Sequence, residues 1–224
     1  MSTEPADLAD LAGLTRRWAE GWAASRRMSV AERPDGVLIV DVGDDKRRAE
    51  LLLVEPDDAT LAAVGAEVVA AGDLWVSVMT APDSEPVVPP GLVALAARDA
   101  LMVRTPVHDG TAPDPCVRLV DDGDRLLATV AGEGDVRIAA QGQVGLVGTD
   151  VVFDRIGTDA AHRRRGLGTL VMTALAEHAA RRGGVEGLLV ATTDGQALYE
   201  RLGWRSVGRF TTSAVRPSVS ARTP

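Results

Sequence analysis

The sequence predicts an α/β fold, and three patterns support this class. Residues 151–156 and 187–192 are short apolar runs rich in β-branched side chains, which is typical of buried strands. Between them, apolar residues recur at steps of three or four from Leu167 to His178, as on one face of an amphipathic helix that stops at Gly183-Gly184. Residues 1–105 also alternate helix-like and strand-like segments. Such alternation is typical of a sheet covered by helices.

The N-terminal half is expected to begin with a helix whose apolar face carries leucines and tryptophans at helical spacing. Residues 43–46 have turn composition, so they predict a hairpin between two strands. Asp57 or Asp58 can cap the next helix, which ends at Gly72. The expected elements are a helix over residues 5–28, strands at 37–42 and 49–54, a helix to residue 71, a strand at 74–79, a proline-rich loop at 81–91, a short helix at 92–100 and a strand at 101–105.

The turn-rich segment 107–115 is the predicted domain boundary. It divides the chain into an N-terminal α/β half (1–112), a second domain (113–216) and a flexible polar tail (217–224). The expected elements after the boundary are strands at 116–120, 125–130, 136–140, 144–147 and 151–156, the helix from residue 167, a strand at 187–192, a short helix at 196–202, and two final strands within 204–215 that bend at Arg209-Phe210.

Composition excludes several functional classes. With a net charge of −8 and a pI near 4.9, the chain is not expected to bind nucleic acid or a membrane surface, whereas an acidic cleft would suit an amine. The single cysteine, Cys116, cannot form an internal disulfide, which predicts a reducing compartment and a cytoplasmic location. The N-terminus is acidic where a signal peptide is basic, and no apolar run approaches the ~20 residues that span a bilayer. The histidine spacing predicts no metal site.

A short basic glycine segment, Arg163-Arg164-Arg165-Gly166-Leu167-Gly168, links the strand at 151–156 to the helix that follows. The start of a helix leaves backbone N–H groups unpaired at its positive end. The oxygens of a phosphate can accept hydrogen bonds from these groups. Glycines let the backbone approach the anion closely, and arginines add charge-assisted hydrogen bonds. The segment therefore predicts a phosphate-binding site.

The type of phosphate ligand can be narrowed. A Walker loop needs a lysine after its last glycine, but Thr169 follows Gly168, and a dinucleotide fingerprint needs a third glycine where Val171 stands. The remaining pattern, R-x-x-G-x-G, resembles the pyrophosphate loop of the GNAT superfamily of acyl-CoA-dependent N-acyltransferases. Residues 197–204 (ALYERLGW) are similar to that family's A-L-Y-x-x-x-G-[FW] segment, in the right order and at a matching separation.

The resemblance implies a mixed, splayed β-sheet flanked by helices, with acetyl-CoA as the acyl donor. The sequence departs from the family pattern in its architecture, because the second domain leaves no room for the two helices that normally follow the first strand. The N-terminal half is therefore expected to be an accessory domain or a degenerate second copy of the fold. The residues that the resemblance places at the cofactor are Ile156, Gly157, Thr158, Arg163, Arg164, Arg165, Gly166, Leu167, Gly168 and Thr169, with Thr193 where relatives carry an asparagine and Asp194 as its substitute.

Two residues are candidates for catalysis. Tyr199 falls at the family's general-acid position, and its phenol is protonated at neutral pH and can donate to a departing thiolate. The alternative for Tyr199 is a packed aromatic on a short helix. Asp154 falls where many relatives carry a glutamate that takes the proton of the amine. Its alternative is a strand carboxylate paired with Arg155 or Arg137, with proton removal through a chain of waters.

The functional prediction is direct transfer of an acetyl group from acetyl-CoA to a primary amine, without a metal. Two rivals belong to other classes: a non-catalytic acyl-CoA-binding regulator, and a nucleotide-binding module that uses the same loop. The acceptor is a small molecule or a peptide, and the sequence leaves open a polyamine, an aminoglycoside, an amino acid or a protein N-terminus. A homodimer is also left open.

Overall fold

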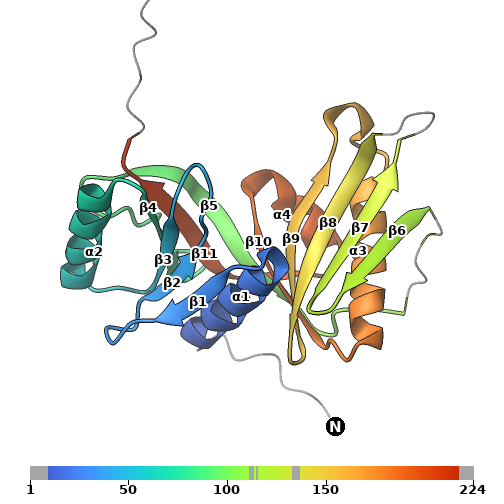
Figure 1. Ribbon diagram of the computed structural model, residues 1–224, viewed down its shortest axis with the longest axis horizontal. Helices are drawn as coiled ribbons and strands as arrows, with labels where there is room; N and C mark the ends of the chain where they lie inside the picture. The colour runs from blue at the N-terminus through green and yellow to red at the C-terminus, as the bar shows by residue number, and fades with distance from the viewer. Residues whose placement is uncertain (1–9, 111–113, 115, 133–136, 217–224) are drawn as a thin grey trace, which may run out of the picture.

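A single mixed sheet runs through the residues that the computed structural model describes, which are 10–110, 114, 116–132 and 137–216. Within them, eleven strands lie in the order β1-β2-β3-β4-β11-β5-β10-β9-β8-β7-β6 (Figure 1). The strands are Ser29–Glu32 (β1), Leu38–Asp41 (β2), Ala49–Val54 (β3), Leu74–Thr80 (β4), Val93–Arg104 (β5), Val117–Asp122 (β6), Arg125–Ala131 (β7), Ile138–Val147 (β8), Asp150–Thr158 (β9), Glu186–Ala191 (β10) and Arg205–Ala214 (β11).

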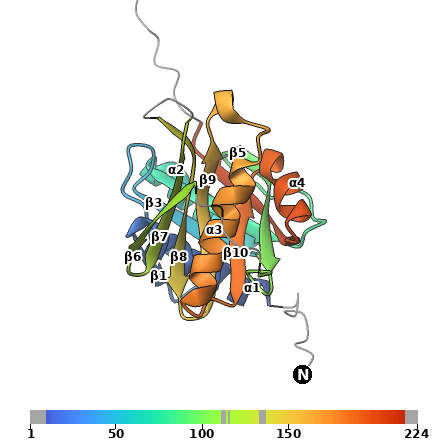
Figure 2. The ribbon, with the colours of Figure 1, turned by 90° about the vertical axis from the view of Figure 1, so that its right-hand side faces the viewer.

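Helices cover both faces of the sheet. The helices are Leu11–Arg26 (α1), Asp58–Ala71 (α2), Leu167–Arg181 (α3) and Thr193–Arg201 (α4), with a short 3₁₀ turn at Ala160–His162 (η1). The core shows which face each one covers: α1 packs on a side-chain layer that includes Leu101 and Val152, whereas α3 packs on the opposite layer that includes Met102 and Phe153. Helices α2 and α4 lie on the same face as α3 (Figures 1 and 2). The α/β class and the flanked sheet are thus confirmed.

The two halves of the chain interleave within the sheet. The last strand, β11, inserts between β4 and β5 and pairs antiparallel with both. Strand β5 in turn pairs with β10, so the sheet passes from one half to the other without a break. The division at residues 112 and 113 stays a prediction, because residues 111–113 lie outside the described part of the chain. The predicted tail, 217–224, also lies outside it.

Strands β9 and β10 separate part-way along their length. Their parallel pairing runs from Asp150 to Phe153 on β9, opposite Glu186 to Leu189 on β10. Beyond this point β9 follows β8 as far as Thr158, and β10 follows β5 as far as Ala191. A bulge at Arg155, whose φ is +52°, coincides with a register shift against β8 and helps β9 to bend away. The predicted splayed sheet is therefore confirmed, and the gap opens at the carboxyl ends of both strands.

Four elements differ from the sequence-based expectation. Residues 92–100 were predicted as a helix before a strand, but β5 is one strand from Val93 to Arg104, because its neighbours β10 and β11 supply hydrogen-bond partners along it. The predicted pair of final strands is one strand, β11, whose irregularities are bulges against β5. Strand β8 joins two predicted strands, and β1 was missed because only four residues pair there.

The helix predicted at residues 5–28 is α1, which begins at Leu11 after the cap Asp10, whose carboxylate accepts the N–H of Gly13. The helix packs unusually closely on β8 and β9. A Cβ atom added at Gly21 would overlap the side chain of Val152, and one added at Gly145 on β8 would overlap the carbonyl oxygen of Gly21. The glycines thus allow direct contact between the helix backbone and the sheet.

We expect the substitution Gly145→Ala to lower the free energy of unfolding by about 1–3 kcal/mol, because the added methyl group meets helix backbone that cannot rotate away. Denaturant-induced unfolding measures this change. The matched control is Gly157→Ala on β9, where the nearest atom to an added Cβ is 4.0 Å away. Equal stabilities for the two variants would contradict the close approach of α1.

Candidate functional site

The basic glycine loop is exposed at the open end of the gap between β9 and β10. Residues 163–166 are exposed, and Gly166 is the N-cap of α3 with a φ of +78°. A Cβ atom added at Gly166 would meet nothing within 4 Å. The first N–H groups of α3, at Leu167 to Thr169, therefore border open space. They form the positive helix end that the sequence predicts for a phosphate.

The end of β9 lies beside this helix start. A Cβ added at Gly168 would lie 3.7 Å from the Thr158 hydroxyl and 3.4 Å from the side chain of Leu198 on α4. The structure thus brings β9, α3 and α4 together at one edge of the sheet. Ile156 anchors this end of β9, because its side chain packs against the core beneath α3. Gly157 is exposed and borders the gap.

Tyr199 is buried on α4, on the face of the sheet that carries α3. The side chain is 8% exposed, and its ring meets Trp204 edge-on at a centroid distance of 6.2 Å. Burial raises the pKa of the phenol to about 12, and the negative charge of Asp154 adds to this shift. A phenol with such a pKa stays protonated at neutral pH and can act as a proton donor.

Thr193 and Asp194 form the first turn of α4, directly after β10 ends. Both are exposed, and the hydroxyl of Thr193 donates to the carbonyl of Arg98 at 3.4 Å. Because β9 and β10 are parallel, their carboxyl ends meet at the same edge. Thr193 and Asp194 thus lie at the edge that also carries the glycine loop. Of the predicted site residues, Asp154 alone is on the α1 face, by its alternation with Val152.

The carboxylate of Asp154 is held by four hydrogen bonds. The guanidinium of Arg26 binds both of its oxygens, each at 2.7 Å. The side chains of Gln143 and Ser25 donate to Oδ2 at 2.8 and 3.2 Å. This geometry favours the pairing alternative that the sequence left open, with Arg26 as the partner in place of Arg155 or Arg137. The role of Asp154 as a base stays a prediction, but its lone pairs are already engaged.

Sequence reasoning missed Arg26, Ser25 and Gln143, because the first two lie more than a hundred residues from Asp154 and no local spacing marks them. For the histidines the sequence predicted no metal site, and it placed His162 next to the glycine loop. His178 pairs with Asp121 at 3.0 Å and His162 with Asp159 at 3.3 Å. No cluster of three or more potential metal ligands occurs among the described residues, and no helix there is long and apolar enough to cross a membrane.

Comparison with known proteins finds a family match for the segment that carries this site. The model of the acetyltransferase (GNAT) domain matches residues 120–206, which include β9, the glycine loop, α3, β10 and α4. Residues 120–206 of the chain thus match a GNAT acetyltransferase domain. The predicted family resemblance is thus confirmed. A comparison with curated proteins gave no match.

Solved GNAT structures share the fold over nearly the whole chain. A GCN5-related N-acetyltransferase from Kribbella flavida is 17% identical, with a TM-score of 0.63 over 95% of this chain and 96% of its own. A GNAT-family protein from Novosphingobium aromaticivorans is 17% identical, with a TM-score of 0.58 over 91% of this chain and 97% of its own. A tandem GNAT protein from the clavulanic acid biosynthesis pathway is 14% identical, with a TM-score of 0.53 over 94% of this chain and 97% of its own. The fold of the chain, including its N-terminal half, therefore has precedents among solved structures.

We expect Asp154→Asn to lower the free energy of unfolding by roughly 2 kcal/mol or more, because Arg26, whose side chain is 22% exposed, then lacks a counter-ion. The control is Asp73→Asn, which breaks an exposed pair with Arg48 and should cost less than about 1 kcal/mol. Denaturant unfolding of both variants measures the difference. Unchanged stability for Asp154→Asn would contradict the structural role of the pair.

Tyr199 is the only tyrosine, so the near-ultraviolet absorbance of phenolate reports on it alone. We expect this signal to rise near pH 12 in the folded protein and near about pH 10 in denaturant. The pKa of Tyr199 is higher in the folded protein than in the unfolded chain. The contribution of its protonated phenol to the free energy of unfolding is therefore intact below about pH 10. About 3 kcal/mol of it is then lost as the pH rises toward 12. A Tyr199→Phe control should lack this loss, and phenolate in the folded protein near pH 10 would contradict the burial.

Proposed function

We propose that the protein is an N-acetyltransferase that moves an acetyl group from acetyl-CoA to a primary amine by direct transfer. One observation carries the proposal: an open, positively charged helix start lies at the edge where β9 and β10 separate, and a buried, protonated phenol lies on the helix that leaves this edge. This arrangement supplies an anchor for a diphosphate and a proton for a departing thiolate.

The residues at the carboxyl ends of β9 and β10 have separate roles in this proposal. In this proposal the N–H groups at Leu167, Gly168 and Thr169, with Arg163, Arg164 and Arg165, hold the diphosphate of coenzyme A. The open space at Gly157 and Gly166 fits this role, because the cofactor can approach their backbone closely. The main chain from Ile156 to Thr158 borders the gap and binds the pantetheine arm and the thioester carbonyl. A donor aimed at that carbonyl oxygen stabilises the oxyanion by a few kcal/mol.

The remaining residues handle protons and position. Tyr199 donates its phenolic proton to the sulfur as the carbon–sulfur bond breaks. Thr193 and Asp194, at the start of α4, line the cofactor where relatives carry an asparagine. Asp154 fixes Arg26 and α1 against β9, so its geometry leaves the removal of the amine proton to another group or to water.

The acceptor in this proposal is a small-molecule or peptide amine in the cytoplasm, and neither a metal nor a nucleic acid or membrane partner takes part. The chain's excess of negative charge suits a cationic acceptor. The oligomeric state, including a homodimer, is not part of the proposal.

A second candidate is a non-catalytic acyl-CoA-binding regulator. The engaged carboxylate of Asp154 and the threonine at position 193 favour it, since both differ from what an active relative is expected to present. Such a protein would bind acetyl-CoA and release no thiol.

The test is a thermal-shift titration with acetyl-CoA and with ATP, followed by a thiol-release assay with acetyl-CoA. The amines are putrescine, kanamycin, lysine and a peptide with a free N-terminus. We expect acetyl-CoA to raise Tm and ATP not to, and at least one amine to release coenzyme A thiol. At 100 times Kd, acetyl-CoA should add about 2.7 kcal/mol to the free energy of unfolding.

Two variants sharpen this test. Arg164→Glu should weaken acetyl-CoA binding at least tenfold, because it places a negative charge beside the diphosphate, whereas Arg118→Ala, at an exposed position of β6, should not. Tyr199→Phe should slow thiol release by about 100-fold without changing acetyl-CoA affinity. Binding without thiol release from any amine would favour the regulator, and stabilisation by ATP alone would favour the nucleotide-binding module.

A further inference from the structure

Asp99 is a half-buried carboxylate in the middle of the sheet. It lies on β5, opposite Phe210 of β11, and Ala100 beside it pairs with Ala191, the last residue of β10. It alternates with Leu101, which packs in the layer beneath α1, so Asp99 is on the α1 face. It therefore lies beside the carboxyl end of β10, on the same face as Asp154.

Unlike the carboxylates of β9 and β10, Asp99 has no counter-ion among the described residues. Asp150 and Glu186 pair with Arg17, and Asp154 pairs with Arg26. Even the buried Glu50 of β3 lies 3.0 Å from the guanidinium of Arg47. Among the described residues, the one group that hydrogen-bonds to Asp99 is the backbone N–H of Thr193. Burial raises the pKa of the Asp99 carboxyl above its ordinary value, and this hydrogen bond opposes the shift.

A carboxylate buried without a counter-ion destabilises the folded protein, and such groups concentrate at functional sites. The position of Asp99 places its carboxylate beside the gap between β9 and β10. The gap between β9 and β10 has one α1-face carboxylate on each side: Asp154 on β9 and Asp99 on β5, next to β10. Asp154 is engaged by four donors, whereas Asp99 accepts one N–H and retains free lone pairs.

We propose that Asp99 is the catalytic base that receives the proton of the acceptor's ammonium group, directly or through one water, as the amine enters the gap from the α1 face. This inference rests on the proposed acetyl transfer. Tyr199 is on the opposite face, so the nucleophile and the leaving thiolate are served by different groups from opposite sides of the sheet.

The protons balance in the following way. The ammonium group gives one proton to the Asp99 carboxylate, and the freed amine attacks the thioester carbonyl. The carbon–sulfur bond then breaks, and the thiolate takes the proton of Tyr199. The second proton of the nitrogen leaves as the amide forms and restores the phenol through solvent. Asp99 releases its proton to water, so one proton is released overall for each amide and thiol formed.

The pH dependence follows from the raised pKa. Asp99 acts when ionised, so kcat/KM should rise with pH through a pKa above that of an ordinary aspartate. The other charged residues on β5 and on the elements packed against it are Arg98 and Arg104 of β5, Glu186 of β10, Asp194, Glu200 and Arg201 of α4, and Arg205 and Arg209 of β11. None of them forms an ion pair with Asp99 in the described part of the chain.

A purely structural role for Asp99 is also conceivable, because it caps the first turn of α4 from outside the helix. The two roles respond differently to substitution. An asparagine keeps an oxygen that can accept the N–H of Thr193, but it cannot take a proton at neutral pH. A structural cap is therefore preserved in Asp99→Asn, and a base is lost.

The experiment measures kcat/KM against pH for the full chain, Asp99→Asn and the control Asp73→Asn, with acetyl-CoA and the fastest amine of the panel above. We expect Asp99→Asn to lower kcat/KM by about 100-fold or more and to abolish the acidic limb of the profile. Its KM for acetyl-CoA should be unchanged, and its Tm at neutral pH should not fall, because an ionised buried group is removed. Asp73→Asn should match the parent throughout.

The inference is overturned if Asp99→Asn keeps its activity within a few-fold, or keeps the acidic limb of the parent protein. If Asp99→Asn fails to fold, Asp99→Glu decides: an acidic limb displaced in pH supports the base, and an unmoved limb overturns it. A parent protein that acetylates no amine overturns the proposed function and this inference together. An active parent with an active Asp99→Asn overturns this inference alone.

Discussion

The attachment of α1 along β9 is the constraint on which the rest of the structure depends. Arg17 pairs with Asp150 and Glu186 near the start of β9, and Arg26 pairs with Asp154 where β9 leaves β10. The two arginines are nine residues apart on a helix, about 13.5 Å. The two aspartates are four residues apart on a strand, about 13 Å. The helix and the strand thus run side by side in matching register, and Gly21 and Gly145 let them touch.

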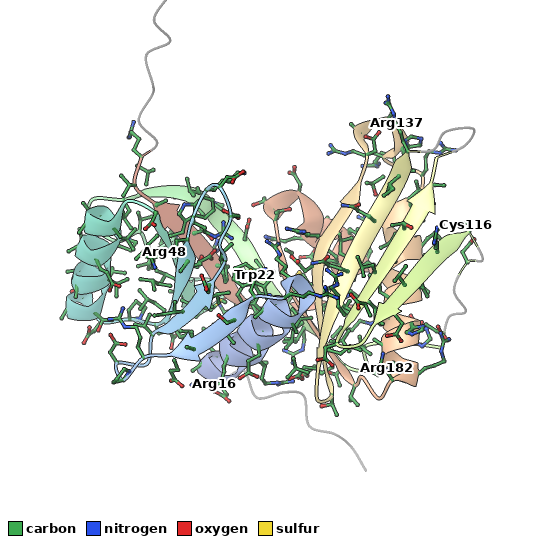
Figure 3. The ribbon with its side chains drawn as sticks, in the orientation of Figure 1. Arg16, Trp22, Arg48, Cys116, Arg137 and Arg182 are labelled. Carbon is green, nitrogen blue, oxygen red and sulfur yellow. The ribbon has the colours of Figure 1, made fainter. Side chains whose placement is uncertain are left out.

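This attachment joins an N-terminal helix to the strand that borders the proposed cofactor site. Helix α1 also packs on β11, through Trp18 against Phe210, and on a core layer that extends to Leu52 of β3 in the N-terminal half. Trp22, labelled between the two arms of the sheet in Figure 3, lies under the guanidinium of Arg26 at 5.3 Å. One side of the gap is therefore shaped by residues from the first helix, and the other side by β5, so the edge is built from both halves of the chain.

Local signals in the sequence predicted local structure well. The second helix was placed correctly from Asp57 to Gly72 because its start and stop depend on neighbouring residues: Asp57 accepts the N–H of Thr60, and Gly72 takes a positive φ. The glycine loop and the helix of Tyr199 were predictable for the same reason. Residues 92–100 were not, because their alanine-rich composition favours a helix in isolation, and the strands that pair with them are distant in sequence. The partner of Asp154 and the isolation of Asp99 depend on such distant pairings too, and no spacing encodes them.

The position of β11 has a consequence for how the protein forms during synthesis. Every other described strand leaves the ribosome before β11, yet β11 belongs between β4 and β5. Until it arrives, these two strands expose a row of unpaired N–H and C=O groups to one another and to other chains. The nascent N-terminal half therefore cannot complete its sheet by itself, and the protein should acquire its native fold in one late, cooperative step governed by contacts between distant parts of the chain.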